Sequence, residues 1–461
     1  MPGAFLLLLK SASAPDEGSS RPPAGGAALD RRAAATGKPH DVTVLSAPVP
    51  TRQRPTAVLV PVYLSTVLSI AAYSVISVAL PFRFQALGLN VFQYGIVMAI
   101  FALGMLLTEG VWGALAYRVA NAVWILVLGS LGAVALAAVG FSTDEWEFAV
   151  VFGLLGALMV FSVPLMRWVA LVAGGPGTGG TGTGRYAVFF GLGIVLGSTI
   201  GPGIYVAVGF LRLCEISVAL WLGSTVALMV VPWSRLEVAD RRTSLLRQMR
   251  RVLTPYFGVV ALLVTLYFTC NTLTSSFLQY YSVSLFGGTA TESGYVIGAS
   301  RATGLVAGFA LGMLVDRWGP AKSTPFGFLL LATGAAGTFF AQSYAEMIGA
   351  TLCFAVGAGW LSADLLPLAL LPVHRDLQGT AVGVFGSFED LGLLVGPVLI
   401  GGVYSAYGAH AIFLVVAAVA VGAMAISAGV GSFMTGQIPV PTEPTSDSAR
   451  PLATESGLGA K

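Results

Sequence analysis

Charged residues stand inside long apolar runs of this sequence. Arg301, Asp364, Glu389 and Asp390 are four of them, and Glu109 and Arg167 are two more that lie near one membrane face. A charge at the centre of a membrane-spanning helix costs about 2.5–3.5 kcal/mol on insertion scales, so each of them needs a partner or a task. A carboxyl group in a weakly polar cavity has its charged form disfavoured, so it can take up and release a proton near the working pH. Glu389, Asp390 and Asp364 are therefore candidates for proton exchange, and an approaching solute or Arg301 could displace the proton.

A static ion pair of Arg301 with Glu389 or with Asp390 accounts for the same charges. Such a pair would neutralise both groups and fix the register of two helices without any exchange. Adjacent residues on a helix point about 100° apart, so the two acids are expected to have different partners. The sequence leaves proton exchange and static pairing open.

Uncharged polar residues follow one face of two apolar runs. Thr66, Ser69 and Tyr73 are spaced by three and four residues, so a helix places them on one side. A similar stripe recurs later in the chain, and the further candidates for contact with a small molecule are Asn271, Ser275, Gln279 and Trp360. Polar residues also hold neighbouring membrane helices together, and this alternative stays open.

The elements that must position these residues have lengths typical of a lipid bilayer. Hydrophobic residues make up 56% of the 461 residues, charged residues 10%, and the mean hydropathy is +0.83. That composition excludes a soluble domain and predicts an all-α membrane protein. Twelve apolar runs are long enough to cross about 30 Å of hydrocarbon. Their approximate limits are 57–82, 91–115, 122–141, 147–171, 186–209, 216–233, 255–280, 293–315, 324–341, 345–371, 379–405 and 409–433.

Basic residues gather in the connections on one side of these runs. The connection between the sixth and seventh runs holds Arg235, Arg241, Arg242, Arg247, Arg250 and Arg251. The positive-inside rule therefore predicts that both termini are cytoplasmic, in a multi-pass protein of the plasma (bacterial inner) membrane. The expected domains are a disordered tail at 1–55, a six-helix bundle at 56–233, a basic linker at 234–254, a second bundle at 255–434 and a disordered tail at 435–461.

A charged turn joins the eighth and ninth runs. It reads Gly312-Met-Leu-Val-Asp316-Arg317-Trp-Gly319-Pro-Ala-Lys322. Gly312 allows two helices to approach closely, and Gly319 supplies a permissive backbone in the turn. A reduced copy lies about 200 residues earlier, where Gly113 and Arg118 keep the pattern and Tyr117 replaces the acid.

A second motif is repeated at nearly the same offset. Gly201-Pro202 and Gly396-Pro397 close two glycine-rich segments that recur 195 residues apart. Two different motifs at one offset predict a duplicated six-helix unit.

The charged turn resembles the cytoplasmic loop signature of the major facilitator superfamily, and the Gly-Pro segments resemble its fifth-helix motif. The resemblance covers about residues 56–434 and implies twelve transmembrane helices in two pseudo-symmetric six-helix bundles. It also implies that the first, fourth, seventh and tenth spans face a central cavity. By the same resemblance Asp316 would meet the start of the fifth helix near Arg185 and Tyr186 and close the cytoplasmic side. The glycines, prolines and arginines of both motifs would act in gating.

The chain is most similar to the drug/metabolite:proton antiporters of that superfamily. The resemblance implies export of a small organic molecule by proton antiport through alternating access. An uptake symporter or facilitator for a sugar or organic anion, and a lipid transporter of the same fold, remain alternatives. No motif argues for an enzyme, a cofactor or a metal site. The expected partners of the chain, a monomer, are its substrate, protons and the bilayer, without nucleic acid.

Overall fold

The structure is a computed structural model that describes residues 55–115, 121–173, 179–231, 233, 245–373 and 377–434. Every regular element in those ranges is a helix, which confirms the predicted all-α class. Arg118, about half of the predicted linker and the predicted tails, apart from Pro55, lie outside the described residues. Gly113 and Asp316 lie in helices, but only their backbone is described.

The first half of the chain runs back and forth as long helices. They are α2 (Pro55–Ala86), α3 (Val91–Leu115), α4 (Ala122–Phe141), α5 (Glu145–Ala173) and α6 (Gly179–Met229). Helix α6 has 51 residues, which is too long for one crossing of about 30 Å. It is broken at Gly209, whose φ of 80° and ψ of 171° are open to glycine and strained for other residues. Helix α6 therefore supplies two crossings.

The second half begins with the short helix α7 (Leu245–Val252), which lies within the predicted linker. The next crossing is built from three consecutive pieces, α8 (Pro255–Thr272), a π-helical turn η2 (Leu273–Phe277) and α9 (Leu278–Ser284). The remaining helices are α10 (Ala290–Trp318), α11 (Pro320–Phe340), α12 (Tyr344–Leu370), α13 (Gln378–Tyr407) and α14 (Ala409–Met434).

The predicted twelve crossings are all accounted for in the described ranges. Ten helices are long and apolar enough to cross a membrane, and one of them, Arg185–Met229, contains both parts of α6. Helix α5, with 29 residues, adds a further crossing. The chain is therefore a multi-pass membrane protein.

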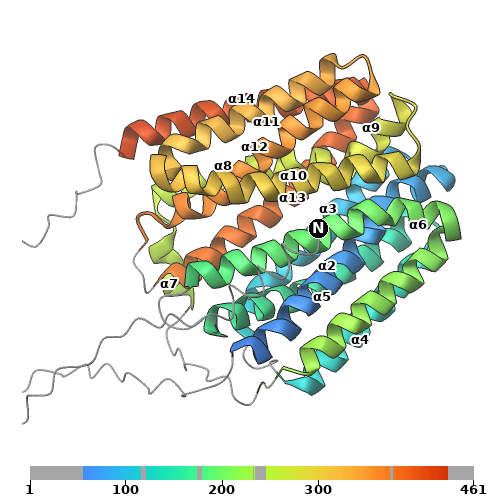
Figure 1. The fold of residues 1–461 in the computed structure, drawn as a ribbon, viewed down its shortest axis with the longest axis horizontal. Helices are drawn as coiled ribbons and strands as arrows, with labels where there is room; N and C mark the ends of the chain where they lie inside the picture. The colour runs from blue at the N-terminus through green and yellow to red at the C-terminus, as the bar shows by residue number, and fades with distance from the viewer. Residues whose placement is uncertain are drawn as a thin grey trace, which may run out of the picture.

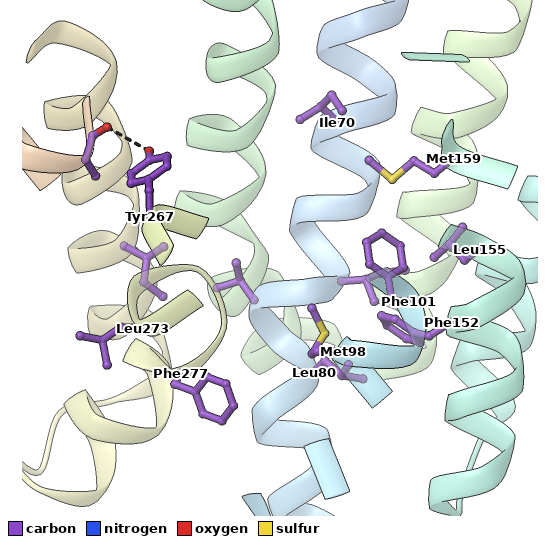
Figure 2. Packing of buried hydrophobic residues seen from close by; sticks show 14 of the residues in the cluster. Ile70, Leu80, Met98, Phe101, Phe152, Leu155, Met159, Tyr267, Leu273 and Phe277 are labelled. Atoms are coloured by element: carbon purple, nitrogen blue, oxygen red, sulfur yellow. Dashed lines mark hydrogen bonds between the residues drawn. The ribbon is translucent and has the colours of Figure 1, made fainter. Parts of the chain in front are cut away.

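The two halves form two bundles that lie side by side (Figure 1). Helix α3 packs against α13, and α6 packs against α10, so these four helices join the bundles. We call the two ends of the molecule the α7 end and the α9 end, after the helices that lie there (Figure 1). Figure 2 shows buried side chains around α2, with Phe101, Phe152 and Leu155 from the first half and Leu273 and Phe277 from the second.

The repeated glycines pack each bundle in the same way. A Cβ added at Gly201 would lie 2.7 Å from the Val75 carbonyl oxygen of α2. A Cβ added at its counterpart Gly396 would lie 3.0 Å from the Thr269 carbonyl oxygen of α8. Only a residue without a side chain permits these crossings, so the sequence repeat corresponds to a repeated helix contact.

Candidate functional site

Charged and aromatic side chains from both bundles meet near the middle of the long helices. Arg301 lies in the middle part of α10 and is half-buried. The charge of Arg301 interacts electrostatically with Tyr267 of α8 and with Tyr73 of α2. Helix α2 belongs to the other bundle. Tyr267 is also an electrostatic neighbour of Glu389, which is half-buried in α13. We call Tyr73, Tyr267, Arg301 and Glu389 the central polar cluster.

Tyr267 is held firmly at the centre of this cluster. Its hydroxyl donates a 2.9 Å hydrogen bond to the Ala358 carbonyl oxygen of α12 (Figure 2). Its ring packs edge-on against Phe268 at a centroid distance of 4.8 Å. The hydroxyl of Thr265 donates to the Phe388 carbonyl oxygen at 3.2 Å, which ties α8 to the part of α13 that carries Glu389. The phenol ring therefore keeps a fixed position relative to both charges.

The contacts of Arg301 can be compared with its predicted ion pair to Glu389 or Asp390. Among the described residues, the ion pair recorded within 4.0 Å joins Arg212 and Glu215, which are exposed and three residues apart. The neighbours recorded for Arg301 are two tyrosines and no carboxylate. Arg301 and Glu389 both interact electrostatically with Tyr267, and the choice between proton exchange and a static ion pair stays a prediction.

A third acid lies close to the acids of α13. Glu109 of α3 is half-buried, and a Cβ added at Gly386 would lie 2.6 Å from its Oε1. Gly386 precedes Glu389 by about one turn, and Asp390 follows it and is 4% exposed. The sequence shows Glu109 as a charge within an apolar run, but only the packing of α3 on α13 reveals where it lies.

Asp364 lies apart from the central polar cluster, within the second bundle. It is fully buried, and its two carboxyl oxygens accept hydrogen bonds from the hydroxyls of Ser323 at 2.8 Å and Thr324 at 2.7 Å. Both hydroxyls belong to the first turns of α11, just after the turn at Gly319. Asp364 thus connects α12 to the charged turn, which favours a structural role at this site.

The predicted polar stripe of α2 is only partly accessible. Thr66 and Ser69 are buried, and their hydroxyls donate to the carbonyl oxygens of Val62 at 2.8 Å and of Thr66 at 3.2 Å. Thr66 also contacts the sulfur of Met166 in α5 at 3.1 Å. Tyr73 is half-buried, so it is the member of this stripe that reaches the central polar cluster.

The stripe predicted in the seventh crossing is interrupted. Asn271 and Ser275 are half-buried, whereas Gln279 is fully buried. The spacing of four assumes an α-helix throughout, but the π-helical turn Leu273–Phe277 lies between the members and rotates the residues that follow it. A π-helical turn has no distinctive signal in one sequence, so the prediction could not include it.

Trp360 does not join the central polar cluster. Its ring lies against Phe326 of α11 at 6.4 Å and Trp318 of α10 at 6.3 Å between ring centroids. Gly359 instead faces α10, at Gly304. With this close contact between α12 and α10, the Trp360 ring lies beside both Trp318 of α10 and Phe326 of α11.

The gating residues predicted from the motifs have different environments. Gly319 ends α10 with a φ of 79°, as expected for a sharp turn. A Cβ at Gly312 would make an ordinary 3.8 Å contact with Ala363. Arg317 is exposed. The side chain of Asp316 lies outside what the structure describes, so its predicted contact near Arg185 and Tyr186 stays a prediction.

Both Gly-Pro motifs touch the opposite bundle. A Cβ added at Gly294 of α10 would lie 2.9 Å from the Pro202 ring, and one added at Gly95 of α3 would lie 2.5 Å from the Pro397 carbonyl oxygen. The glycine before each proline packs inside its own bundle, Gly396 against α8 for example. Each motif therefore links packing within a bundle to the interface between bundles.

Aromatic rings close the interface at the α9 end. Tyr94 of α3 lies 5.4 Å from Phe277 and 5.6 Å from Tyr280 between ring centroids. The Tyr280 hydroxyl is buried and has no hydrogen-bond partner among the described residues. The two bundles are thus in close contact at the α9 end.

Comparisons with known proteins agree with this architecture. The family model described as Major Facilitator Superfamily matches residues 62–396 and 260–451. The protein "Multidrug resistance protein MdtG" of Salmonella typhi is 25% identical over 387 residues, covering 77% of this chain and 91% of its own length. The protein of the same name from Enterobacter lignolyticus is 25% identical, with 81% and 91% covered.

Solved structures show the same fold at low identity. A bacterial homolog of the human lysosomal transporter Spinster, in an inward-facing and unoccupied conformation, has a TM-score of 0.73 and 13% identity, with 84% of this chain and 99% of that chain covered. The nucleoside transporter NupG has a TM-score of 0.69 and 12% identity, with 81% and 98% covered.

Proposed function

The chain belongs to the major facilitator superfamily, and from that membership we propose that this transporter exports a small organic molecule, a drug or a metabolite, in exchange for protons. The observation that carries the proposal is the central polar cluster. It brings a carboxyl group, a guanidinium cation and two phenols together near the middle of the long helices, with side chains from both bundles. A group at such a junction can be exposed to either side as the bundles tilt.

Glu389 is the group to which we assign the proton. It is half-buried near the junction of the two bundles, and it lies one residue from the buried Asp390. Loss of its proton creates a charge that favours a conformation in which that charge is hydrated or paired. Binding and release of one proton therefore bias the two conformations differently, which is the requirement for coupling.

The proposed orientation of the protein in the membrane is inferred from the basic linker. Arg250 and Arg251 are exposed on α7, so we assign the α7 end to the cytoplasm and the α9 end to the outside. The contacts of Tyr94 with Phe277 and Tyr280 then lie on the outer side, where they hold the two bundles together in this conformation.

The direction of transport has separate support. The similar curated proteins bear the name multidrug resistance protein, at 25% identity over most of the chain. The Gly-Pro motifs, which resemble those of antiporters in the superfamily, both lie at the bundle interface. These two observations favour export over uptake.

The test uses everted membrane vesicles whose lumen is acidified, with the gradient followed by quenching of an acridine dye. A solute exchanged for protons dissipates the gradient, so a panel of drugs and metabolites can be scanned. We expect the wild type to respond to part of the panel and Glu389→Gln to lose the response. Glu215→Gln, the same change at an exposed position, serves as the matched control.

Other outcomes would change the assignment. Solute counterflow that ignores the gradient identifies a facilitator, and movement of solute and proton in one direction identifies a symporter. A response that survives unchanged in Glu389→Gln removes this residue from the proton step.

A further inference from the structure

Basic and aromatic side chains gather on an exposed face of the second bundle, around the turn between α10 and α11. Helix α10 begins beside α9, and its 29 residues carry it across to the α7 end, where Arg317 and Trp318 are its last two residues. Lys322 and Phe326 lie one helical turn apart on the same side of α11. Arg317 and Lys322 are exposed, and Trp318 and Phe326 are each 47% exposed. We call these four residues the turn patch.

A buried tryptophan lies behind the two exposed rings of the turn patch. Helices α10 and α11 each pack along α12 and touch each other much less, so α12 lies behind the seam between them (Figure 1). Trp360 of α12 is 7% exposed, and its ring centroid lies 6.3 Å from that of Trp318 and 6.4 Å from that of Phe326. The Trp360 indole N–H is buried and has no hydrogen-bond partner among the described residues, so a donor stands unused behind the patch.

The two cations of the turn patch have no acidic partner recorded. In the described part of the chain, no ion pair and no side-chain hydrogen bond is recorded for Arg317 or Lys322. The guanidinium carries five N–H donors and the ammonium three. A phosphate group accepts strong charge-assisted hydrogen bonds from both kinds of donor. The patch therefore offers an anionic group two cations from two adjacent helices.

The position of the turn patch favours a lipid as the source of that anionic group. The patch lies at the ends of two membrane-spanning helices, at the level of lipid headgroups, and the cytoplasmic leaflet is rich in anionic lipids. A soluble anion would use the cations alone, whereas a phospholipid also covers the exposed rings. Aromatic residues are common at membrane interfaces. That tendency alone does not account for two cations without acidic partners beside a buried, unused N–H donor.

We propose that the turn patch binds one anionic phospholipid, with the phosphate on Arg317 and Lys322 and the acyl chains against Trp318 and Phe326. An ester oxygen between the two exposed rings would give the Trp360 N–H a hydrogen-bond partner. The bound lipid connects the end of α10 to the first turns of α11, so it stabilises a junction at which the two helices touch each other little. The inference does not depend on proton exchange or on the direction of transport. It uses the proposed orientation only to assign the site to the cytoplasmic leaflet.

The test is native mass spectrometry of purified full-length protein in detergent, with lipids added at known concentrations. Dioleoyl-phosphatidylglycerol and dioleoyl-phosphatidylcholine have the same acyl chains and differ in headgroup charge, and glycerol phosphate offers the phosphate without chains. We expect one phosphatidylglycerol to bind at least about tenfold more tightly than phosphatidylcholine, because its net negative charge is not cancelled within the headgroup. Glycerol phosphate is expected not to be retained, because it makes no contact with the rings.

The variants separate the turn patch from the rest of the basic surface. The double variant Arg317→Gln, Lys322→Gln should bind the two lipids equally. Its matched control, Arg250→Gln with Arg251→Gln, removes two exposed arginines of α7 at the same end of the molecule and should keep the preference for phosphatidylglycerol. Trp360→Phe keeps a ring without the N–H and should weaken the binding of both lipids. The melting temperature of each variant without lipid confirms that it is folded.

Several results would overturn the proposal. Equal wild-type affinities for the two lipids would do so, as would unchanged affinities in Trp360→Phe. A preference that the α7 variant loses as completely as the turn-patch variant would show attraction to the basic surface as a whole. Tight binding of glycerol phosphate would indicate a site for a soluble anion instead. An absence of proton exchange in everted vesicles would refute the proposed antiport and leave the lipid site standing, so the two proposals can fail separately.

Discussion

A methyl group at Gly95 is expected to shift the balance between the conformations of the transporter. A Cβ at this position would lie 2.5 Å from the Pro397 carbonyl oxygen and 3.2 Å from its carbon, both in the opposite bundle. The oxygen belongs to a backbone and cannot rotate away. Helices α3 and α13 would therefore have to separate by roughly half an ångström or more at the α9 end.

Overpacking of this kind costs about 1–3 kcal/mol. Because the clash exists only while the α9 end is closed, Gly95→Ala penalises that conformation and spares the open one. An energy of that size changes the ratio of the two conformations about 5–150-fold. The open population should rise accordingly.

The assay is electron–electron double resonance between spin labels at Thr143 and Gln342. Both residues are exposed in connections at the α9 end, one in each bundle. Cys214, Cys270 and Cys353 are first replaced by serine or alanine. The distance distribution should gain a longer component in Gly95→Ala.

Gly104→Ala is the matched control. A Cβ there would meet the backbone of Gly153 and Ala157, which belong to the same bundle. This variant should lower the melting temperature without lengthening the label distance. The reasoning is refuted if Gly95→Ala keeps the wild-type distances, or if Gly104→Ala lengthens them equally.

Three further outcomes follow from the same contacts. Tyr280→Phe removes a buried hydroxyl without a recorded partner, so it should stabilise the closed α9 end by about 1 kcal/mol and shorten the mean label distance; an unchanged distribution would contradict this. Asp364→Asn should lower thermal stability by about 1–3 kcal/mol, and a double-mutant cycle with Thr324→Val should show coupling rather than additivity. Asp390→Asn should weaken gradient-driven transport less than Glu389→Gln if the half-buried acid carries the proton, and equal losses would implicate both acids.

Much of the fold is readable from the chain because membrane helices follow local rules. The length of an apolar run determines whether it can cross the bilayer, and this gave the limits of most crossings to within a few residues. The repeated Gly-Pro segments indicated two copies of one bundle, since a glycine that contacts a neighbouring helix has to recur in both copies. Composition and motif spacing were sufficient for these conclusions.

The candidate site was only partly predictable. Arg301, Tyr73 and Glu389 stood out as polar residues in apolar runs. The structure brings Arg301 close to Tyr73 and Tyr267, and Glu389 close to Tyr267. The sequence also selected Trp360, whose ring the structure places beside Trp318 and Phe326. A polar residue in an apolar run requires polar neighbours, but the sequence does not show which helix supplies them.

Helix rotation and helix pairing are the features that tertiary structure alone decided. Trp360 lies beside rings of α10 and α11, and the π-helical turn Leu273–Phe277 moves Gln279 off the face predicted from a spacing of four. Likewise, Asp364 meets two hydroxyls of α11 and Glu109 meets α13 because of which helices pack together. Local periodicity establishes that a helix has a polar side, whereas the direction of that side depends on long-range packing between segments far apart in the chain.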